Sequence, residues 1–204
     1  TEFAKLRSEV ESLFPLFHSK SEKKTFGKDC WIYKIKGQDS KHRVMLMSHH
    51  DVAPVEGKWL HPPFSGKIAD GKLWGRGTID TKTSLFAELQ SLEELLSEGW
   101  TPACDVYLGS SYNEEIGGDG IPLAVEYFNS RKEFFDLVLD EGGAVLSAPM
   151  PGISCKCAML AIHEKGRLSL NCTASNASSH AGLSAKKETP IVRISKFISA
   201  VSSK

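Results

Sequence analysis

The chain lacks two features that would each place it in a special class of protein. Among its 204 residues no apolar run approaches the ~20 residues that a membrane-spanning helix needs. Neither sign of charge is in excess, since 25 Lys and Arg residues balance 25 Asp and Glu residues, so the bulk composition shows no basic nucleic-acid footprint. We therefore expect neither a membrane nor a nucleic acid among the partners of this protein.

The chain also has too few cysteines, in the wrong arrangement, for a disulfide framework. Five cysteines are an odd number for a chain of this size and indicate free thiols in a reducing compartment. The Cys155-x-Cys157 pair has no second Cys or His pair at finger spacing, so strand side chains are favoured over metal ligands. The charged N-terminus does not resemble a secretory signal. We expect a cytoplasmic location, with a secretory or vacuolar one left open if a signal was removed before Thr1.

Apolar periodicity predicts an alternation of strands and helices. Helical spacing predicts helices over residues 2–17, 83–98 and 121–132, and a last helix from Pro190, where Thr189 suits the N-cap. Apolar runs predict strands over residues 30–36, 44–48, 105–111 and 137–139, the last of them short and buried. This order predicts an α/β fold with a mostly parallel sheet flanked by helices. Beyond Pro151, alternating residues within 158–175 predict further extended segments.

Potential metal ligands follow three of the predicted strands. The strand over 44–48 leads into His49-His50-Asp51, the strand over 105–111 into Glu114-Glu115, and the strand over 137–139 into Asp140-Glu141. Parallel α/β sheets bind ligands outside the carboxyl ends of their strands. Several carboxylates gathered there need a positive partner, and a pair of divalent metal ions would neutralise them. Asp80, just before a predicted helix, could bridge two such ions.

Each of these residues also has an ordinary structural interpretation. A single His at a strand end is more often structural than a ligand, and Glu114-Glu115 could be a solvated turn. Asp80 could cap a helix, and Asp140 could cap a turn. The joint occurrence of the motifs, in this order and at three strand ends, favours the metal site.

These segments resemble the M20 family of zinc metallopeptidases and amidohydrolases. Within that family the chain is most similar to the branch of carboxypeptidase S and the N-fatty-acyl-amino-acid hydrolases. The resemblance covers residues from about 44 to 190, and the matching segments are SHHDVAPVEGKWLHPPFSGKIADGKLWGRGTIDTK, SYNEEIGGDG, LVLDEGG and AMLAIHEKGRLSL…SSHAG…KKETP.

The resemblance implies a role for each matching residue. It makes His49 and Asp140 ligands of one zinc ion, Glu115 a ligand of a second, and Asp80 the bridge between the two. Cobalt or manganese could replace zinc. It makes Asp51 the carboxylate that orients His49, and Glu114 the general base that takes a proton from water. It also implies that the Asp80–Thr81 peptide bond is cis.

The resemblance also implies a substrate, a partner and a role in the second domain. The substrate would be a peptide or an N-acyl amino acid, cleaved next to the amino-acid carboxylate. His180 matches a lid-domain histidine that contacts substrate or the developing oxyanion, although an ordinary loop histidine is an open alternative. Some members of the family are dimeric, so the resemblance also allows a homodimer formed through the lid. A non-catalytic relative that serves in binding or assembly is the alternative function.

Two departures from the family pattern qualify these expectations. Ser48 stands where the family usually has Gly. The last zinc ligand of the family is a His that follows the lid, and no histidine follows His180 before Lys204. We therefore expect residues 1–163 to be a catalytic α/β domain without its returning C-terminal segment, and residues 164–204 to begin the lid. We expect this stretch alone to be inactive.

Overall fold

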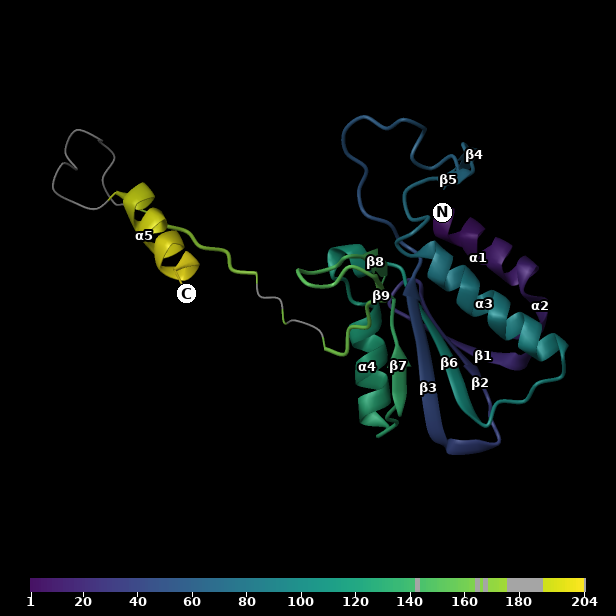
Figure 1. The fold of residues 1–204 in the computed structure, drawn as a ribbon. Helices are drawn as coiled ribbons and strands as arrows, with labels where there is room; N and C mark the ends of the chain where they lie inside the picture. The colour runs from purple at the N-terminus through teal and green to yellow at the C-terminus, as the bar shows by residue number, and fades with distance from the viewer. Residues whose placement is uncertain (142–143, 164–165, 167–168, 176–188, 204) are drawn as a thin grey trace. The chain divides into compact units, whose positions relative to one another are not determined.

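The computed structural model describes residues 1–141, 144–163, 166, 169–175 and 189–203, and it divides into two compact units. The first unit spans Thr1–Ala158 and the second spans Met159–Lys204. All elements of the first unit except two small hairpins belong to one sheet and the helices on its faces (Figure 1). Each unit is described by itself below.

The sheet of the first unit has five strands in the order β1-β2-β6-β3-β7. Strand β3 pairs in parallel with β6 and with β7, whereas β2 is antiparallel to both β1 and β6. Four strands thus run in one direction and β2 in the other, which confirms the predicted α/β fold and shows that the sheet is mixed. The strands are β1 (Ser21–Phe26), β2 (Cys30–Ile35), β3 (Asp39–His49), β6 (Cys104–Ser111) and β7 (Leu137–Leu139).

Helices cover both faces of this sheet because its central strands carry apolar side chains on both sides. Trp31, Tyr33 and Ile35 of β2 lie in one core cluster with residues of α1 (Glu2–Leu13), α2 (Pro15–Lys20) and α3 (Lys82–Ser97). Ile32 of the same strand faces the opposite way and packs with α4 (Gly120–Ser130) (Figure 1). The alternation of β2 side chains therefore builds the two cores.

The single helix predicted over residues 2–17 is two helices, so that prediction is wrong in one respect. Helix α1 ends at Leu13 and α2 begins at Pro15. Between them Phe14 has φ −125° and ψ 60°, outside the helical region. Proline has no backbone N–H and disfavours helical geometry in the residue before it, which accounts for the break.

The strand predicted over residues 137–139 forms, but the prediction that it is buried is wrong. Strand β7 forms and pairs with β3, but Leu137, Val138 and Leu139 are all about half exposed. Among the residues that the structure describes, this strand pairs with β3 alone, at the edge of the sheet. An edge position, which an apolar run does not reveal, leaves the side chains of β7 less covered than those of the central strands.

Three further pairings were not predicted. Strand β1 forms in a lysine-rich stretch, at the edge of the sheet, with most of its residues exposed. Strands β4 (Lys67–Ala69) and β5 (Lys72–Trp74) form a hairpin in the turn-rich segment, and β8 (Val145–Ser147) and β9 (Lys156–Ala158) form another. Cross-strand pairing stabilises these short segments although their own patterns are weak.

The second unit contains one described helix, α5 (Pro190–Ser202). Thr189 caps this helix, since its hydroxyl accepts a hydrogen bond from the Val192 N–H, which confirms the predicted start. The extended segments predicted after residue 158 do not appear as strands in the described parts of 159–175, because no pairing partner is present among those residues. None of the described helices is long and apolar enough to cross a membrane.

Candidate metal centre

The parallel pairing of β3 with β6 brings two of the predicted motifs to one edge of the sheet. In the register of this pair, Ser48 lies opposite Ser110 and His49 lies opposite Ser111. The chain leaves β6 directly after Ser111 and forms the short helix η1 (Glu114–Ile116). The carboxyl end of β3 therefore meets Glu114 and its neighbours, as the motif spacing predicted.

His49 is the centre of the site and is almost completely buried, with 1% of its surface exposed. Its Nε2 atom lies 2.9 Å from Asp80 Oδ1, 3.2 Å from Glu141 Oε1 and 3.8 Å from Glu114 Oε2. Its Nδ1 atom lies 3.1 Å from the Asp51 carbonyl oxygen and 3.3 Å from Asp51 Oδ1. One imidazole ring is thus approached by four acidic side chains.

Asp51 fixes the turn that carries the two glutamates. Its Oδ1 accepts a hydrogen bond from the Glu114 N–H and its Oδ2 accepts one from the Glu115 N–H, both at 3.1 Å. Both N–H groups belong to η1, which has no side-chain cap of its own. Asp51 therefore holds His49 on one side and the backbone of Glu114 and Glu115 on the other, consistent with an orienting role.

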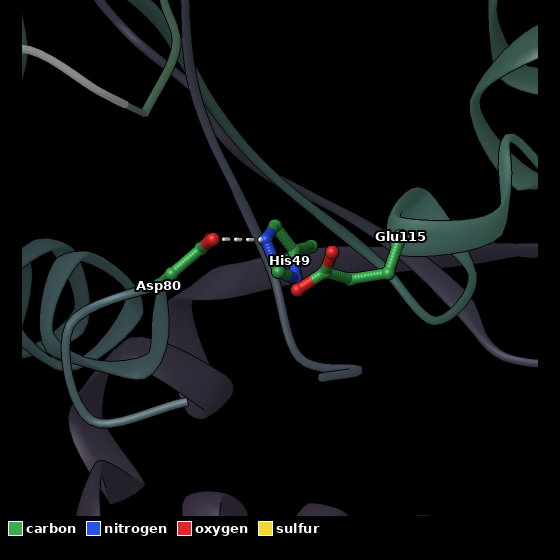
Figure 2. Close-up of side chains that lie close together, drawn as sticks. All are labelled: His49, Asp80 and Glu115. Carbon is green, nitrogen blue, oxygen red and sulfur yellow. Dashed lines mark hydrogen bonds and ion pairs between the residues drawn. The ribbon is translucent and has the colours of Figure 1, made fainter. Parts of the chain in front are cut away.

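Glu115 and Asp80 approach His49 from two different segments, as Figure 2 shows. The Asp80–Thr81 peptide bond, just before α3, is cis, which confirms the prediction. Glu115 also accepts a hydrogen bond from the Ala53 N–H through Oε1, at 2.9 Å. His49, Asp80 and Glu115 together have one ligand atom each within 4.8 Å of one another.

Asp140 belongs to neither group of potential ligands found among the described residues, whereas its neighbour Glu141 belongs to a second one. Glu141 forms a second set of potential ligands with His49 and Glu114. Asp140 is exposed and its Oδ1 accepts a hydrogen bond from the Glu141 N–H at 2.8 Å. Glu141 was not singled out from the sequence, although its place beside Asp140 at the end of β7 was a usable signal.

The pKa values of the site show the cost of gathering these charges. Burial on its own would lower the pKa of His49, but the Asp80 hydrogen bond and the charges of Glu141 and Asp51 outweigh burial and raise that pKa. Burial raises the pKa of Glu114, and the negative charges of Glu115, Asp51 and Asp80 raise it further. The charge of His49 acts in the opposite direction but does not cancel this rise. Burial likewise raises the pKa of Glu141.

The donor set fits a divalent metal ion. His49 has a single proton to donate from Nε2, and that proton cannot serve the three carboxylates around it at once. A divalent cation would satisfy these oxygens and lower the repulsion among them. Imidazole nitrogen and carboxylate oxygens are ligands that zinc accepts.

His50, next to His49, faces the protein core. It stacks on Trp31 with ring centroids 4.1 Å apart, and its Nδ1 lies 2.8 Å from Ser110 Oγ. Burial lowers the pKa of His50 to about 3, so this ring is neutral. His50 belongs to neither group of potential metal ligands found among the described residues.

A cavity of about 360 Å³ opens beside the candidate ligands. Its lining includes His49, Glu114, Asp140 and Glu141 together with Ile121 and Pro122 of α4. Ser48, which departs from the family pattern, also lines it and donates a hydrogen bond to Glu88 Oε2 at 2.8 Å. His180 lies outside the described residues, so its predicted contact with substrate remains a prediction.

This α/β sheet gathers a histidine and carboxylates at the carboxyl ends of its strands, an arrangement that suits a divalent metal ion. The profile of Peptidase family M20/M25/M40 matches residues 45–194, which is most of the chain. The chain belongs to this family, whose metallopeptidases bind divalent metal ions.

Two relatives and one solved structure illustrate what the chain is similar to. It is 33% identical over 204 residues to the probable carboxypeptidase S-like 2 of Dictyostelium discoideum, covering 97% of this chain and 39% of the relative. It is 36% identical over 181 residues to the N-fatty-acyl-amino acid synthase/hydrolase PM20D1 of Xenopus tropicalis, covering 85% of this chain and 35% of the relative. The M20 family metallo-carboxypeptidase Sso-CP2 from Sulfolobus solfataricus superimposes with a TM-score of 0.57 at 28% identity, covering 70% of this chain and 32% of that one. The chain therefore spans about two fifths or less of the length of these proteins.

Proposed function

We propose that the protein containing this chain is a zinc-dependent hydrolase that cleaves a peptide or N-acyl amide bond next to an amino-acid carboxylate. The observation that carries this proposal is the position of Glu114. Its carboxylate lies 3.8 Å from His49 Nε2, within a group of potential metal ligands, and lines the 360 Å³ cavity. A general base for water attack has to stand beside both the metal and the substrate space.

The metal ligands proposed from the sequence are His49, Asp80, Asp140 and Glu115, with Asp80 shared between two ions. A bound divalent ion supplies Lewis acidity and lowers the pKa of water toward ~7, which provides a nucleophile at neutral pH. Asp51 holds the imidazole of His49 from the Nδ1 side, so that Nε2 faces Asp80 and Glu141. This arrangement keeps the ring oriented for a ligand at Nε2.

Glu114 has the proton-transfer role in this proposal. Its carboxylate takes a proton from the attacking water and delivers it to the nitrogen of the leaving amine. Its position suits this role, because its carboxylate lines the cavity and lies 3.8 Å from His49 Nε2. Asp51 keeps Glu114 in place by accepting the hydrogen bond of its backbone N–H.

A second cavity supports a substrate with an apolar part. It has a volume of about 610 Å³ and is formed by residues that flank Asp51 and Asp80 in the sequence, among them Val52, Gly77 and Thr78. Its wall is mostly apolar and also includes Pro63, Phe64, Leu73 and Phe86. We propose that this cavity accepts an apolar acyl group or side chain of the substrate.

The experiment uses the full-length protein that contains this chain. It compares the rate of hydrolysis of N-acyl amino acids and of dipeptides by the wild type and by its Glu114→Gln variant. The proposal expects the variant to lose at least ~10³-fold in kcat while it still binds zinc, because Gln cannot accept the proton. Glu126→Gln, on the exposed side of α4, is the matched control and should keep full activity. Equal turnover by Glu114→Gln would refute the role of Glu114 as the general base. No hydrolysis of either substrate class by the zinc-loaded wild type would refute the proposed activity and favour a binding role.

A further inference from the structure

The thiols of the chain differ widely in their access to solvent. Cys30 is fully buried, and burial together with the charge of Asp119 raises its pKa to about 12, so it is chemically inert in the folded protein. Cys104 is half-buried within β6. Cys155 is exposed and Cys157 is half-buried, and both lie outside the metal centre.

Cys155 and Cys157 are held next to each other by the last hairpin of the first unit. Strand β9 begins at Lys156 and pairs antiparallel with β8, which places Cys157 opposite Leu146. The carbonyl of Cys155 accepts a hydrogen bond from the Ala148 N–H at 3.2 Å, so the hairpin also anchors the residue before the strand. The two Sγ atoms lie 3.9 Å apart.

The Cys155–Cys157 pair does not provide enough ligands for a metal site. A tetrahedral zinc ion takes four ligands, and two thiolates supply only half of them. Among the described residues, no histidine or carboxylate joins the two thiols in a group of three potential ligands. A pair of thiols without further ligands is suited to thiol–disulfide exchange instead.

We propose that Cys155 and Cys157 form a redox-active dithiol that exchanges with small-molecule disulfides and closes to an intramolecular disulfide. In the first step, the thiolate of the exposed Cys155 attacks a disulfide such as oxidised glutathione, and one glutathione thiolate leaves. In the second step, the thiolate of Cys157 attacks the Cys155 sulfur of this mixed disulfide, and the second glutathione thiolate leaves. The dithiol loses two protons and two electrons, and the oxidised glutathione is reduced to two thiols.

The geometry of the hairpin favours the second step over a lasting mixed disulfide. The sulfur atoms need to approach by roughly 2 Å to reach the bond length of about 2.05 Å, and the tethered thiol attacks at a high effective concentration. Lys156, exposed between the two cysteines, acts on the first step, because its positive charge attracts an anionic disulfide. Neither Cys104 nor Cys172 has a second thiol within contact distance among the described residues.

The experiment uses the chain with a Cys172→Ser substitution, incubated in glutathione buffers of increasing oxidised fraction and then alkylated. We expect two of the four remaining thiols to become protected together, with a loss of two hydrogens in the intact mass. Trypsin cleaves after Lys156, so the disulfide would join the peptides 133–156 and 157–165, which separate after reduction. Addition of reduced glutathione should restore both thiols.

Single variants provide the decisive control. In Cys157→Ser the second step is blocked, so Cys155 should accumulate one glutathione, which the parent should not. Cys104→Ser is the matched control and should behave as the parent. The proposal is overturned if both cysteines of the parent become glutathionylated separately, if neither reacts while unfolded protein does, or if the protected pair includes Cys104.

Discussion

At the scale of single residues, the acidic side chains of the site perform different tasks although they share one edge of the sheet. Asp51 accepts two backbone hydrogen bonds and orients His49, so it acts through its neighbours. Asp80 and Glu115 face the His49 ring and can bind a metal ion. Glu114 faces the cavity and can exchange a proton with substrate. The task follows from where each carboxylate points.

Substitution of Asp140 and of Glu141 in turn shows which of the two carboxylates binds the metal ion. We expect Asp140→Asn to weaken zinc binding by more than ~100-fold, because Asp140 is the proposed ligand and its only described side-chain hydrogen bond is to the adjacent N–H. We expect Glu141→Gln to weaken zinc binding by less than ~10-fold, because its contact uses the same Nε2 atom that a metal would occupy. Competition with a chromogenic chelator measures both affinities. The reverse order of effects would make Glu141 the ligand.

Glu88 gives the folded protein a specific pH dependence. Burial raises its pKa to about 7, above its model-peptide value of 4.5, against the hydrogen bond from Ser48 that lowers it. The folded state thus holds this proton more tightly than the unfolded state does. Its stabilising contribution is complete below about pH 4.5 and is lost as the pH rises through 7.

The Glu88→Gln variant tests this dependence. Since Gln does not titrate, the variant should gain about 1–2 kcal/mol relative to the wild type between pH 4.5 and pH 8, a value reduced for the partial exposure of Glu88. Urea unfolding in the presence of a chelator measures the free energy at each pH. Glu126→Gln serves as the control, and identical pH profiles for wild type and Glu88→Gln would contradict the assignment.

At the scale of elements, two of the described helices, α2 and η1, depend on side chains of other segments to accept their first N–H groups. Helix α2 has no side-chain cap of its own and starts with Pro15. The carboxylate of Glu93, on α3, accepts hydrogen bonds from the Leu16 N–H at 2.9 Å and the Phe17 N–H at 2.6 Å. A residue more than seventy positions away thus satisfies the free N–H groups at the start of α2.

Removal of this cap should destabilise the sheet domain measurably. We expect Glu93→Ala to lower the free energy of unfolding by about 1–3 kcal/mol, because the partly buried Phe17 N–H and the exposed Leu16 N–H both lose a charged acceptor. Glu94→Ala, at the exposed neighbouring position, should change it by less than ~0.5 kcal/mol. Chemical denaturation followed by circular dichroism measures both. Equal effects at the two positions would show that the cap contributes nothing.

At the scale of the whole molecule, the two units differ in how they are stabilised. Every buried residue of the two core clusters lies within Thr1–Ala158. Helix α5 of the second unit has no buried residue, and Ile191, Phe197, Ile198 and Val201 are exposed on it. The hydrophobic stabilisation of this chain is therefore concentrated in the first unit.

The first unit should fold without the second. We expect removal of residues 159–204 to shift the midpoint of thermal unfolding of the sheet domain by less than about 2 °C, because the buried residues of both core clusters belong to the first unit. Phe17→Ala, which empties a fully buried position, is the positive control and should cost about 3–5 kcal/mol. Thermal unfolding followed by circular dichroism compares the three proteins. Loss of cooperative unfolding in the truncated chain would contradict this expectation.

The sequence by itself determined the fold class and the segments that carry the chemistry. Strand ends followed by His49, Glu114 and Asp140 are visible because apolar runs mark buried strands and polar residues mark where they stop. Pro15 was also a signal for the break between the first two helices, since proline restricts the residue before it. The helical periodicity of residues 2–17 continues across this break and led to the prediction of a single helix.

Only the tertiary structure decided which of these residues meet. The two carboxylate oxygens of Asp51 bind N–H groups more than sixty positions away, and Glu141 rather than Asp140 approaches His49. Such contacts depend on the register of β3 against β6 and β7 and on the path of each loop. Register and loop path are set by long-range packing, which local sequence patterns do not encode.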